Sequence, residues 1–149
     1  MKIEDAINQK KPFASALEKA IVNILFTSSH CKDLNEVYFK KFGITDKQYN
    51  ILRIVKGAEY PISTNQIRSR MLEKMSDTSR LVDRLAKKNL IFKSKNELDH
   101  RLVDIQLTEK GESLLTQVLS PAQATGVYKK TLSDHELELL SDLLDRFRG

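Results

Sequence analysis

Small polar side chains and two arginines share one face of a predicted helix that begins at Ser76. Its first turn offers the hydroxyls of Ser76 and Ser79, and Arg80 and Arg84 follow one turn apart. Hydroxyls can meet base edges or phosphates in the ~12 Å wide major groove of a duplex, and a guanidinium can bind a guanine edge or a flanking phosphate. The alternative is a solvated helix surface on which either arginine pairs with Asp83. The residue types leave both interpretations open.

A second cluster, Asp99, His100 and Arg101, lies between two predicted strands, where no structural requirement accounts for an arginine. An aspartate two residues before an arginine can hold the guanidinium through a charge-assisted hydrogen bond and so set its direction. An arginine presented on a thin ribbon suits a narrow minor groove, whose negative potential attracts it. The alternative is a surface ion pair in a mobile loop, which contributes little to stability.

The elements that must position these residues are mostly helices. A heptad pattern predicts one long helix over residues 12–41, with Pro12 in its first turn and Gly43 after its end. Such a helix is long for a chain of this size, so part of its apolar face is expected to be covered by another chain. Three capping boxes predict further helix starts, at Thr45, Ser63 and Ser133.

The helix from Ser76 is amphipathic, and Asn89 suits a left-handed cap at its end. Its predicted inner face consists of Thr78, Leu81, Val82 and Leu85. Beyond this helix, the spacing of apolar residues changes from a helical period of 3.6 residues to a strand period of 2 residues. A half-buried strand is predicted from three apolar residues that alternate with polar ones, Val103, Ile105 and Leu107, with residues 90–94 as its partner.

Two helices complete the predicted order. One begins at Thr108 and reaches about Lys129, with a kink at Pro121, and the other covers residues 133–147. A long helix, three short helices, a hairpin and two final helices form the arrangement of a winged helix-turn-helix.

Charge and composition narrow the function classes. The 149 residues are 40% hydrophobic and 30% charged, which suits a globular domain. The net charge is +5, and residues 45–107 carry an excess of that size, with 13 Lys and Arg against eight Asp and Glu. Local basicity of this kind suits a polyanionic partner. No run reaches the ~18 apolar residues of a membrane span, and no signal peptide is expected, so a cytoplasmic protein is predicted.

Four motifs occur in the order and spacing of MarR-type transcriptional regulators, and the chain resembles that family. The motifs are Leu81-Val82-Asp83-Arg84-Leu85, Lys87-Lys88-Asn89-Leu90-Ile91, Asp99-His100-Arg101 and Leu107-Thr108-Glu109-Lys110-Gly111. The resemblance implies a mainly α fold with a small β-hairpin wing. In this single MarR-type domain, residues 45–107 would form the winged helix-turn-helix lobe, and residues 12–41 and 108–149 the dimerisation helices. It further implies that the helix from Ser76 reads the major groove and that Arg101 enters the minor groove.

The function implied is that of a sequence-specific DNA-binding transcriptional regulator, without enzymatic activity or cofactor. The expected protein is a homodimeric repressor that binds a palindromic operator in double-stranded DNA and is released by a small aromatic or phenolic effector. Pattern and resemblance together give ten candidate DNA contacts, namely Thr64, Ser76, Asp77, Thr78, Ser79, Arg80, Arg84, Lys95, Asp99 and Arg101.

Members of the family often bind effectors near the junction of the first two helices. Four side chains at this junction are the candidates here, namely Tyr38, Phe42, Tyr49 and Arg53. For each aromatic residue, an ordinary place in the core is the alternative, and Arg53 can also simply stay solvated.

Other functions remain open. Cys31, the only cysteine, shares a heptad row with Leu17 and Ile24, which favours a buried, inert thiol. Because several relatives sense peroxides through a cysteine in the first helix, a redox-sensing repressor is an alternative. A non-specific architectural DNA-binding protein and a dimeric protein-interaction module are two more. No metal site is expected, because the three histidines lie in three different elements.

Overall fold

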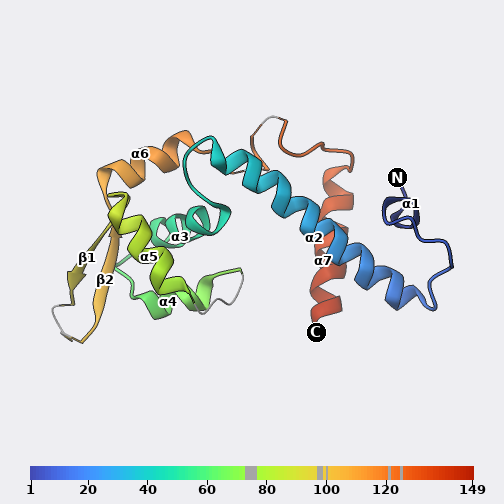
Figure 1. Cartoon of the computed structure of the whole chain (residues 1–149). Helices are drawn as coiled ribbons and strands as arrows, with labels where there is room; N and C mark the ends of the chain where they lie inside the picture. The colour runs from blue at the N-terminus through green and yellow to red at the C-terminus, as the bar shows by residue number, and fades with distance from the viewer. Residues whose placement is uncertain (73–76, 97–98, 100, 121, 125) are drawn as a thin grey trace. The chain divides into compact units, whose positions relative to one another are not determined.

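The structure is a computed structural model that describes residues 1–72, 77–96, 99, 101–120, 122–124 and 126–149. It divides into two compact units, Met1–Leu119 and Ser120–Gly149. Figure 1 shows the elements. The first unit contains α1 (Ile3–Ala6), α2 (Ala16–Lys40), α3 (Asp46–Lys56), α4 (Thr64–Arg70), α5 (Thr78–Lys87), β1 (Ile91–Lys95), β2 (Val103–Leu107) and α6 (Glu109–Gln117), and the second contains α7 (Asp134–Arg148). The predicted fold class, mainly α with a β-hairpin, is confirmed.

The long helix α2 begins four residues later than predicted. Its N-cap is Ser15, whose side chain accepts a hydrogen bond from the Glu18 backbone N–H at 3.1 Å. The Glu18 carboxylate in turn accepts from the Ala14 backbone N–H at 2.6 Å. This local cap defines the helix start, so Pro12 lies outside the helix and not in its first turn. The predicted end is confirmed, because α2 stops at Lys40 and Gly43 follows with a φ of +67°.

All three predicted capping boxes are present. In α3, α4 and α7 the N-cap hydroxyl accepts from the N3 backbone N–H, and the N3 side chain accepts from the N-cap backbone N–H. The three N-caps are Thr45, Ser63 and Ser133.

Helix α5 packs its predicted inner face into the core of the first unit. Thr78, Leu81, Val82 and Leu85 are all buried. The helix begins at Thr78, two residues after the predicted start, and Ser76 lies outside the described residues. At the other end, Asn89 has a φ of +57°, which confirms the left-handed cap. The largest fully buried side chains around it come from the neighbouring elements and include Phe39, Ile51, Leu52, Ile67, Ile91 and Ile105.

The hairpin is anchored to the helices at one end. Strands β1 and β2 pair antiparallel, from Ile91 opposite Leu107 to Lys95 opposite Val103. Ile105 is fully buried and also pairs with Ile62, the segment before α4, through backbone hydrogen bonds of 2.9 and 3.3 Å. Val103 is 42% exposed, so the predicted inward position of this residue is wrong. It lies two residues nearer the tip, beyond the part of the strand that Ile62 covers.

The helix after the hairpin is much shorter than predicted. Helix α6 ends at Gln117, and the described residues between 118 and 133 are not helical. A proline at position 121 explains the end, because it has no N–H for the carbonyl four residues earlier and its ring clashes with that carbonyl. The predicted kink at Pro121 itself lies outside the described residues.

Two helices expose apolar side chains in the single chain. On α2 these are Leu17, Ile21, Leu25, Phe26 and Val37, each at least 40% exposed. On α7 they are Leu137, Leu139, Leu140, Leu143 and Phe147, and none of the residues of this helix is buried. Apolar surface in such amounts usually marks a protein interface.

Candidate functional site

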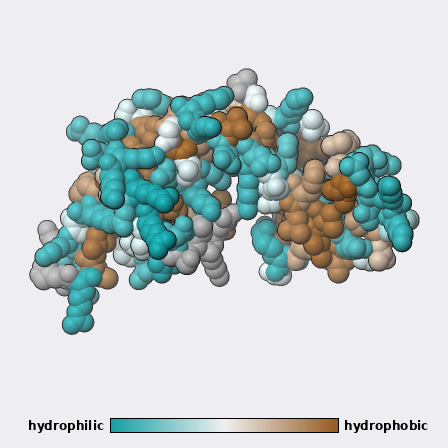
Figure 2. All heavy atoms as spheres, in the orientation of Figure 1, coloured by the Kyte–Doolittle hydropathy of each residue, from teal (hydrophilic) through white to brown (hydrophobic). Residues whose placement is uncertain are grey.

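The exposed face of α5 carries only part of the predicted contact set. Ser79 and Arg80 are exposed in its first turn, and Figure 2 shows hydrophilic side chains gathered over this helix. Thr78 is fully buried, so its predicted contact with DNA is wrong, because a side chain packed in the core cannot reach a groove. Asp77, the N-cap residue, is half-buried, and its Oδ1 has no hydrogen-bond partner among the described residues.

The ion pairs anticipated within α5 do not form. Asp83 pairs instead with Lys93 of β1, and this hydrogen bond holds the pKa of the Asp83 carboxyl below its ordinary value. In the described part of the chain, neither Arg80 nor Arg84 makes an ion pair. Arg84 is exposed and lines a cleft beside the end of α2. Pairing Asp83 with β1 therefore leaves both guanidinium groups available to a ligand.

The hairpin tip presents Arg101 in a fixed backbone conformation. Asp99 Oδ1 accepts a hydrogen bond from the Arg101 backbone N–H at 3.0 Å, and Asn96 Oδ1 accepts from the Asp99 N–H at 2.9 Å. The predicted bond from Asp99 to the guanidinium is therefore wrong, since this carboxylate holds the backbone. The Arg101 side chain is exposed and makes no ion pair within the described ranges. His100 lies outside those ranges.

Helix α4 adds cations that the sequence reasoning missed. Thr64 is half-buried at its start, and Lys95 is exposed at the end of β1. Arg68 and Arg70 are exposed in the last turn of α4, which packs against α5. Two arginines two residues apart, in the helix before the predicted recognition helix, were the available signal.

The aromatic residues at the α2–α3 junction belong to the core. Tyr38 and Tyr49 are each 8% exposed, and the Phe39 ring stacks on Tyr49 with centroids 4.5 Å apart. The Tyr38 hydroxyl donates to the Leu119 carbonyl at 3.0 Å. Burial raises the pKa of Tyr49, although the charge of Arg53 on the exposed face of α3 acts in the opposite direction. The core interpretation therefore holds for both tyrosines.

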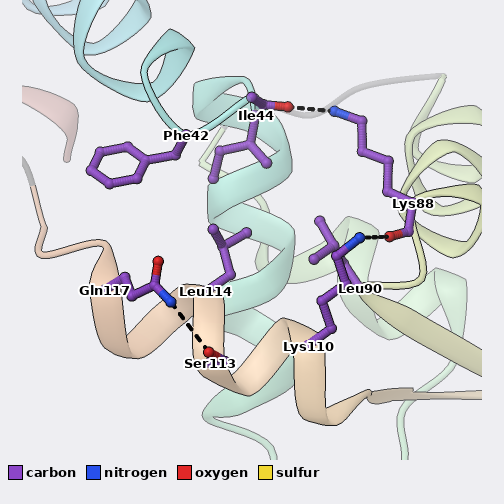
Figure 3. A pocket seen from close by; sticks show the side chains of 9 residues that line it. Phe42, Ile44, Lys88, Leu90, Lys110, Ser113, Leu114 and Gln117 are labelled. Atoms are coloured by element: carbon purple, nitrogen blue, oxygen red, sulfur yellow. Dashed lines mark hydrogen bonds between the residues drawn. The ribbon is translucent and has the colours of Figure 1, made fainter.

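A cavity of about 360 Å³ lies next to this junction (Figure 3). Of the four predicted effector residues, Phe42 lines it, together with Gly43, Ile44, Lys88, Leu90, Lys110, Ser113, Leu114 and Gln117. Tyr38, Tyr49 and Arg53 are not among its lining residues. Figure 3 shows apolar side chains and two lysines facing the same space, with Lys110 Nζ 3.0 Å from the Lys88 carbonyl oxygen.

The remaining features to consider are the cysteine, metal binding and membrane-spanning helices. Cys31 is half-buried on α2, not buried as the heptad pattern predicts. Within the described residues, no group of three or more His, Cys, Asp and Glu could hold a metal ion. In the same part of the chain, no helix combines the length and apolar character needed to cross a membrane.

Comparison with known proteins identifies the family. The family pattern described as MarR family matches residues 42–102. The transcriptional regulator MgrA of Staphylococcus aureus is 30% identical over 108 residues, which are 72% of each chain. The chain belongs to the MarR family. The matched segment contains α3, α4, α5 and β1, so the predicted family is confirmed where the predicted contacts lie.

One more sequence relative and one solved structure are also similar to this chain. The transcriptional repressor MdtR of Bacillus subtilis is 31% identical over 99 residues, and the match covers 66% of this chain and 63% of MdtR, less than two thirds of that relative. A mutant of MarR from E. coli, solved with operator DNA, superposes with a TM-score of 0.74 at 22% identity, covering 85% of this chain and 91% of MarR. The latter likeness shows the winged-helix fold. The MarR-family relatives MdtR and MgrA are named as a transcriptional repressor and a transcriptional regulator.

Proposed function

We propose that the protein is a homodimeric repressor that binds a palindromic operator in double-stranded DNA. The observation that carries the proposal is the hairpin tip, where Asp99 and Asn96 hold the backbone of an exposed Arg101 that has no ion pair among the described residues. A guanidinium presented in this way suits a narrow, negatively charged minor groove. The E. coli MarR mutant was solved with operator DNA, which supports a duplex as the partner. Such a protein acts in the cytoplasm, where the duplex would be.

Helix α5 supplies the second contact in this proposal. Ser79 and Arg80 of its first turn enter the major groove next to Asp77, while Thr64, Arg68 and Arg70 of the adjacent α4 and Lys95 of β1 reach phosphates. Ser76 is a further candidate contact and lies outside the described residues. Thr78 is excluded because it is buried. Phosphate contacts by the cations supply much of the affinity and make it depend on salt.

Dimerisation follows in the proposal from the apolar faces of α2 and α7. A second copy would cover leucines that a single chain leaves in water, and burial releases about 25 cal/mol per Å² of apolar surface. Two copies place two α5 helices in successive major grooves, about 34 Å apart. Analytical ultracentrifugation tests this step, and a purely monomeric protein at micromolar concentration contradicts it.

The Arg101→Ala variant tests the DNA interface. We expect at least tenfold weaker operator binding at moderate salt in a gel-shift titration, because the minor-groove contact is lost. The matched control is Lys10→Ala, which removes an exposed cation from a segment with no proposed contact and should leave affinity within twofold. Equal losses in the two variants, or none in Arg101→Ala, refute insertion of this side chain.

Selection of bound duplexes from a random pool at physiological salt supplies the operator and tests specificity. A palindromic sequence among the selected duplexes supports a symmetric, sequence-specific dimer. Competition by random duplex as effective as competition by the selected sequence favours the non-specific architectural alternative.

In this proposal the effector that releases the operator binds in the cavity in Figure 3. Phe42, Leu90 and Leu114 offer it an apolar wall, and Lys88 and Lys110 offer cations. A volume of about 360 Å³ suits a single aromatic ring with a small polar group. Benzoate and phenol serve as probes, with release of labelled operator as the readout. Leu114→Trp fills the space and should abolish release without preventing operator binding, whereas unchanged release places the effector elsewhere.

A further inference from the structure

A second cavity, of about 580 Å³, lies between the last turn of α2, the turn that leads into α3 and the last turn of α5. Four cations line it, namely Lys40 from α2, Arg84 and Lys87 from α5, and Lys88 just after α5. Among the described residues that line it, Glu36 is the single acidic one. We refer to this space as the cationic cleft. It adjoins the cavity in Figure 3, and Gly43, Ile44 and Lys88 line both.

The positive charge of the cleft is not neutralised within the described residues. Lys88 Nζ lies 2.6 Å from the Gly43 carbonyl oxygen and 3.3 Å from Gln48 Oε1, and both acceptors are uncharged. Lys40, Arg84 and Lys87 form no ion pair in the described part of the chain. None of the four cations therefore has an ion-pair partner among the described residues, although the charge of Lys87 also acts on the Asp83 carboxylate.

Helix ends account for part of this charge but not for all of it. Cations are stabilised at helix C-termini, and each terminus is equivalent to about half a negative charge. The last turns of α2 and α5 together offset about one unit. Four cations less the Glu36 carboxylate leave three, so roughly two positive charges remain without a counterpart. A ligand with two negative charges would complete the balance.

We propose that the cationic cleft binds a small dianion of the phosphate monoester or dicarboxylate type. Its volume lies within the ~300–1,000 Å³ typical of small-molecule sites. An arginine fork beside lysines suits both phosphate and carboxylate oxygens. Field lines concentrate in a cleft lined by one sign of charge, which raises the local concentration of an anion.

A small molecule fits this site better than a duplex backbone does. The proposed major-groove contacts lie at the first turn of α5, and Ser79 and Lys87 are eight residues apart, about 12 Å along the helix axis. The buried residues Ile44 and Gln48 also line the cleft. A phosphodiester backbone needs an accessible surface beside the groove-reading residues.

Isothermal titration calorimetry on the full chain tests the proposal, at constant ionic strength in a buffer free of phosphate. The probes are glycerol 2-phosphate and succinate, which distinguish the two ligand types, with acetate as a monoanionic comparison. We expect saturable binding of at least one dianion and at least tenfold weaker binding in the double variant Lys40→Gln with Lys87→Gln. The charge-matched control, Lys10→Gln with Lys11→Gln, should bind as the unmodified protein does.

A variant that is expected to bind the dianion more tightly distinguishes a specific charge effect from a general loss of structure. Glu36→Gln removes the carboxylate that lines the cleft and should tighten dianion binding several-fold. The proposal is overturned by absence of binding at 10 mM probe, by equal losses in the two double variants, or by an unchanged Kd in Glu36→Gln.

Operator gel shifts on the same variants separate this inference from the proposed function. The Lys40 and Lys87 double variant should keep its operator affinity, whereas Arg101→Ala loses it. If the double variant instead loses operator affinity and no probe binds, the cleft is a DNA-phosphate surface and the dianion site is refuted. If Arg101→Ala has no effect while the dianion titrations behave as expected, only the proposed DNA contact fails.

Discussion

Gly111 lies where the start of α6 presses against the end of the α5–β1 connection, and replacing it with alanine should destabilise the fold. A Cβ at this position would overlap the Leu90 carbonyl oxygen and lie 3.1 Å from the Leu90 carbonyl carbon and 3.2 Å from Leu107 Cδ2. The obstacle is backbone, so no side-chain rotation relieves it. The same Leu90 oxygen accepts a hydrogen bond from the Thr108 N–H at 3.2 Å, which a displaced peptide would weaken.

The magnitude follows from opposing effects. Overpacking of a core contact costs about 1–3 kcal/mol, and a weakened hydrogen bond adds about 1 kcal/mol. Alanine in a helix regains about 1 kcal/mol relative to glycine. For Gly111→Ala we therefore expect a net loss of about 2 kcal/mol in the free energy of unfolding.

Urea unfolding followed by far-UV circular dichroism measures this difference, at one protein concentration because dimerisation would contribute to stability. The matched control is Gly57→Ala, where the new Cβ meets only the Arg53 carbonyl oxygen at an ordinary 3.4 Å and φ is −80°. This control should change stability by no more than about 0.5 kcal/mol. A Gly111→Ala variant as stable as Gly57→Ala would refute the close-approach argument.

Further variants probe single interactions in the same lobe. Tyr38→Phe should lower the free energy of unfolding by about 1 kcal/mol, because it deletes a 3.0 Å hydrogen bond to a backbone carbonyl. Tyr49→Phe should raise the free energy of unfolding by about 1 kcal/mol, because the buried Tyr49 hydroxyl has no partner in the described residues. Urea titrations of the two variants compare these effects directly. Thr45→Ala removes the N-cap of α3 and should cost about 1 kcal/mol in thermal or urea unfolding, and an unchanged stability would show that the cap is dispensable. The lowered pKa of Asp83 implies that its ionised carboxylate stabilises the folded state at pH values above the ordinary carboxyl range, and that this stabilisation is lost as pH falls through the folded-state pKa. Lys93→Gln should return the pKa of Asp83 toward its ordinary value in an NMR titration. A pKa that does not move in this variant contradicts the assigned cause.

Sequence patterns succeed where the determining interaction is local. The capping boxes at Thr45, Ser63 and Ser133 form because donor and acceptor lie three residues apart. The left-handed Asn89 is likewise a property of one residue and its neighbours. The start of α2 was predictable on the same grounds, since Ser15 and Glu18 carry the same three-residue spacing as those boxes.

Long-range packing explains the predictions that failed. Thr78 was counted among the groove-facing hydroxyls, yet tertiary contacts bury it completely. Asp83 had two arginines within reach on its own helix and is paired with Lys93 on a strand ten residues away. Such choices depend on which elements meet, and a helical pattern alone does not specify the partner.

The sequence by itself determined the order of the elements, most of the helix starts and the four motifs that indicate the MarR family, because hydrogen-bond caps, hydrophobic periods and motif spacing are properties of nearby residues. Only the tertiary structure decided that Asp83 pairs with Lys93, that Gly111 must lack a side chain, and that Lys40, Arg84, Lys87 and Lys88 surround one cleft. These depend on the approach of segments up to 48 residues apart in the chain, from position 40 to position 88, and the energy of such an approach is set by the packing of the whole lobe.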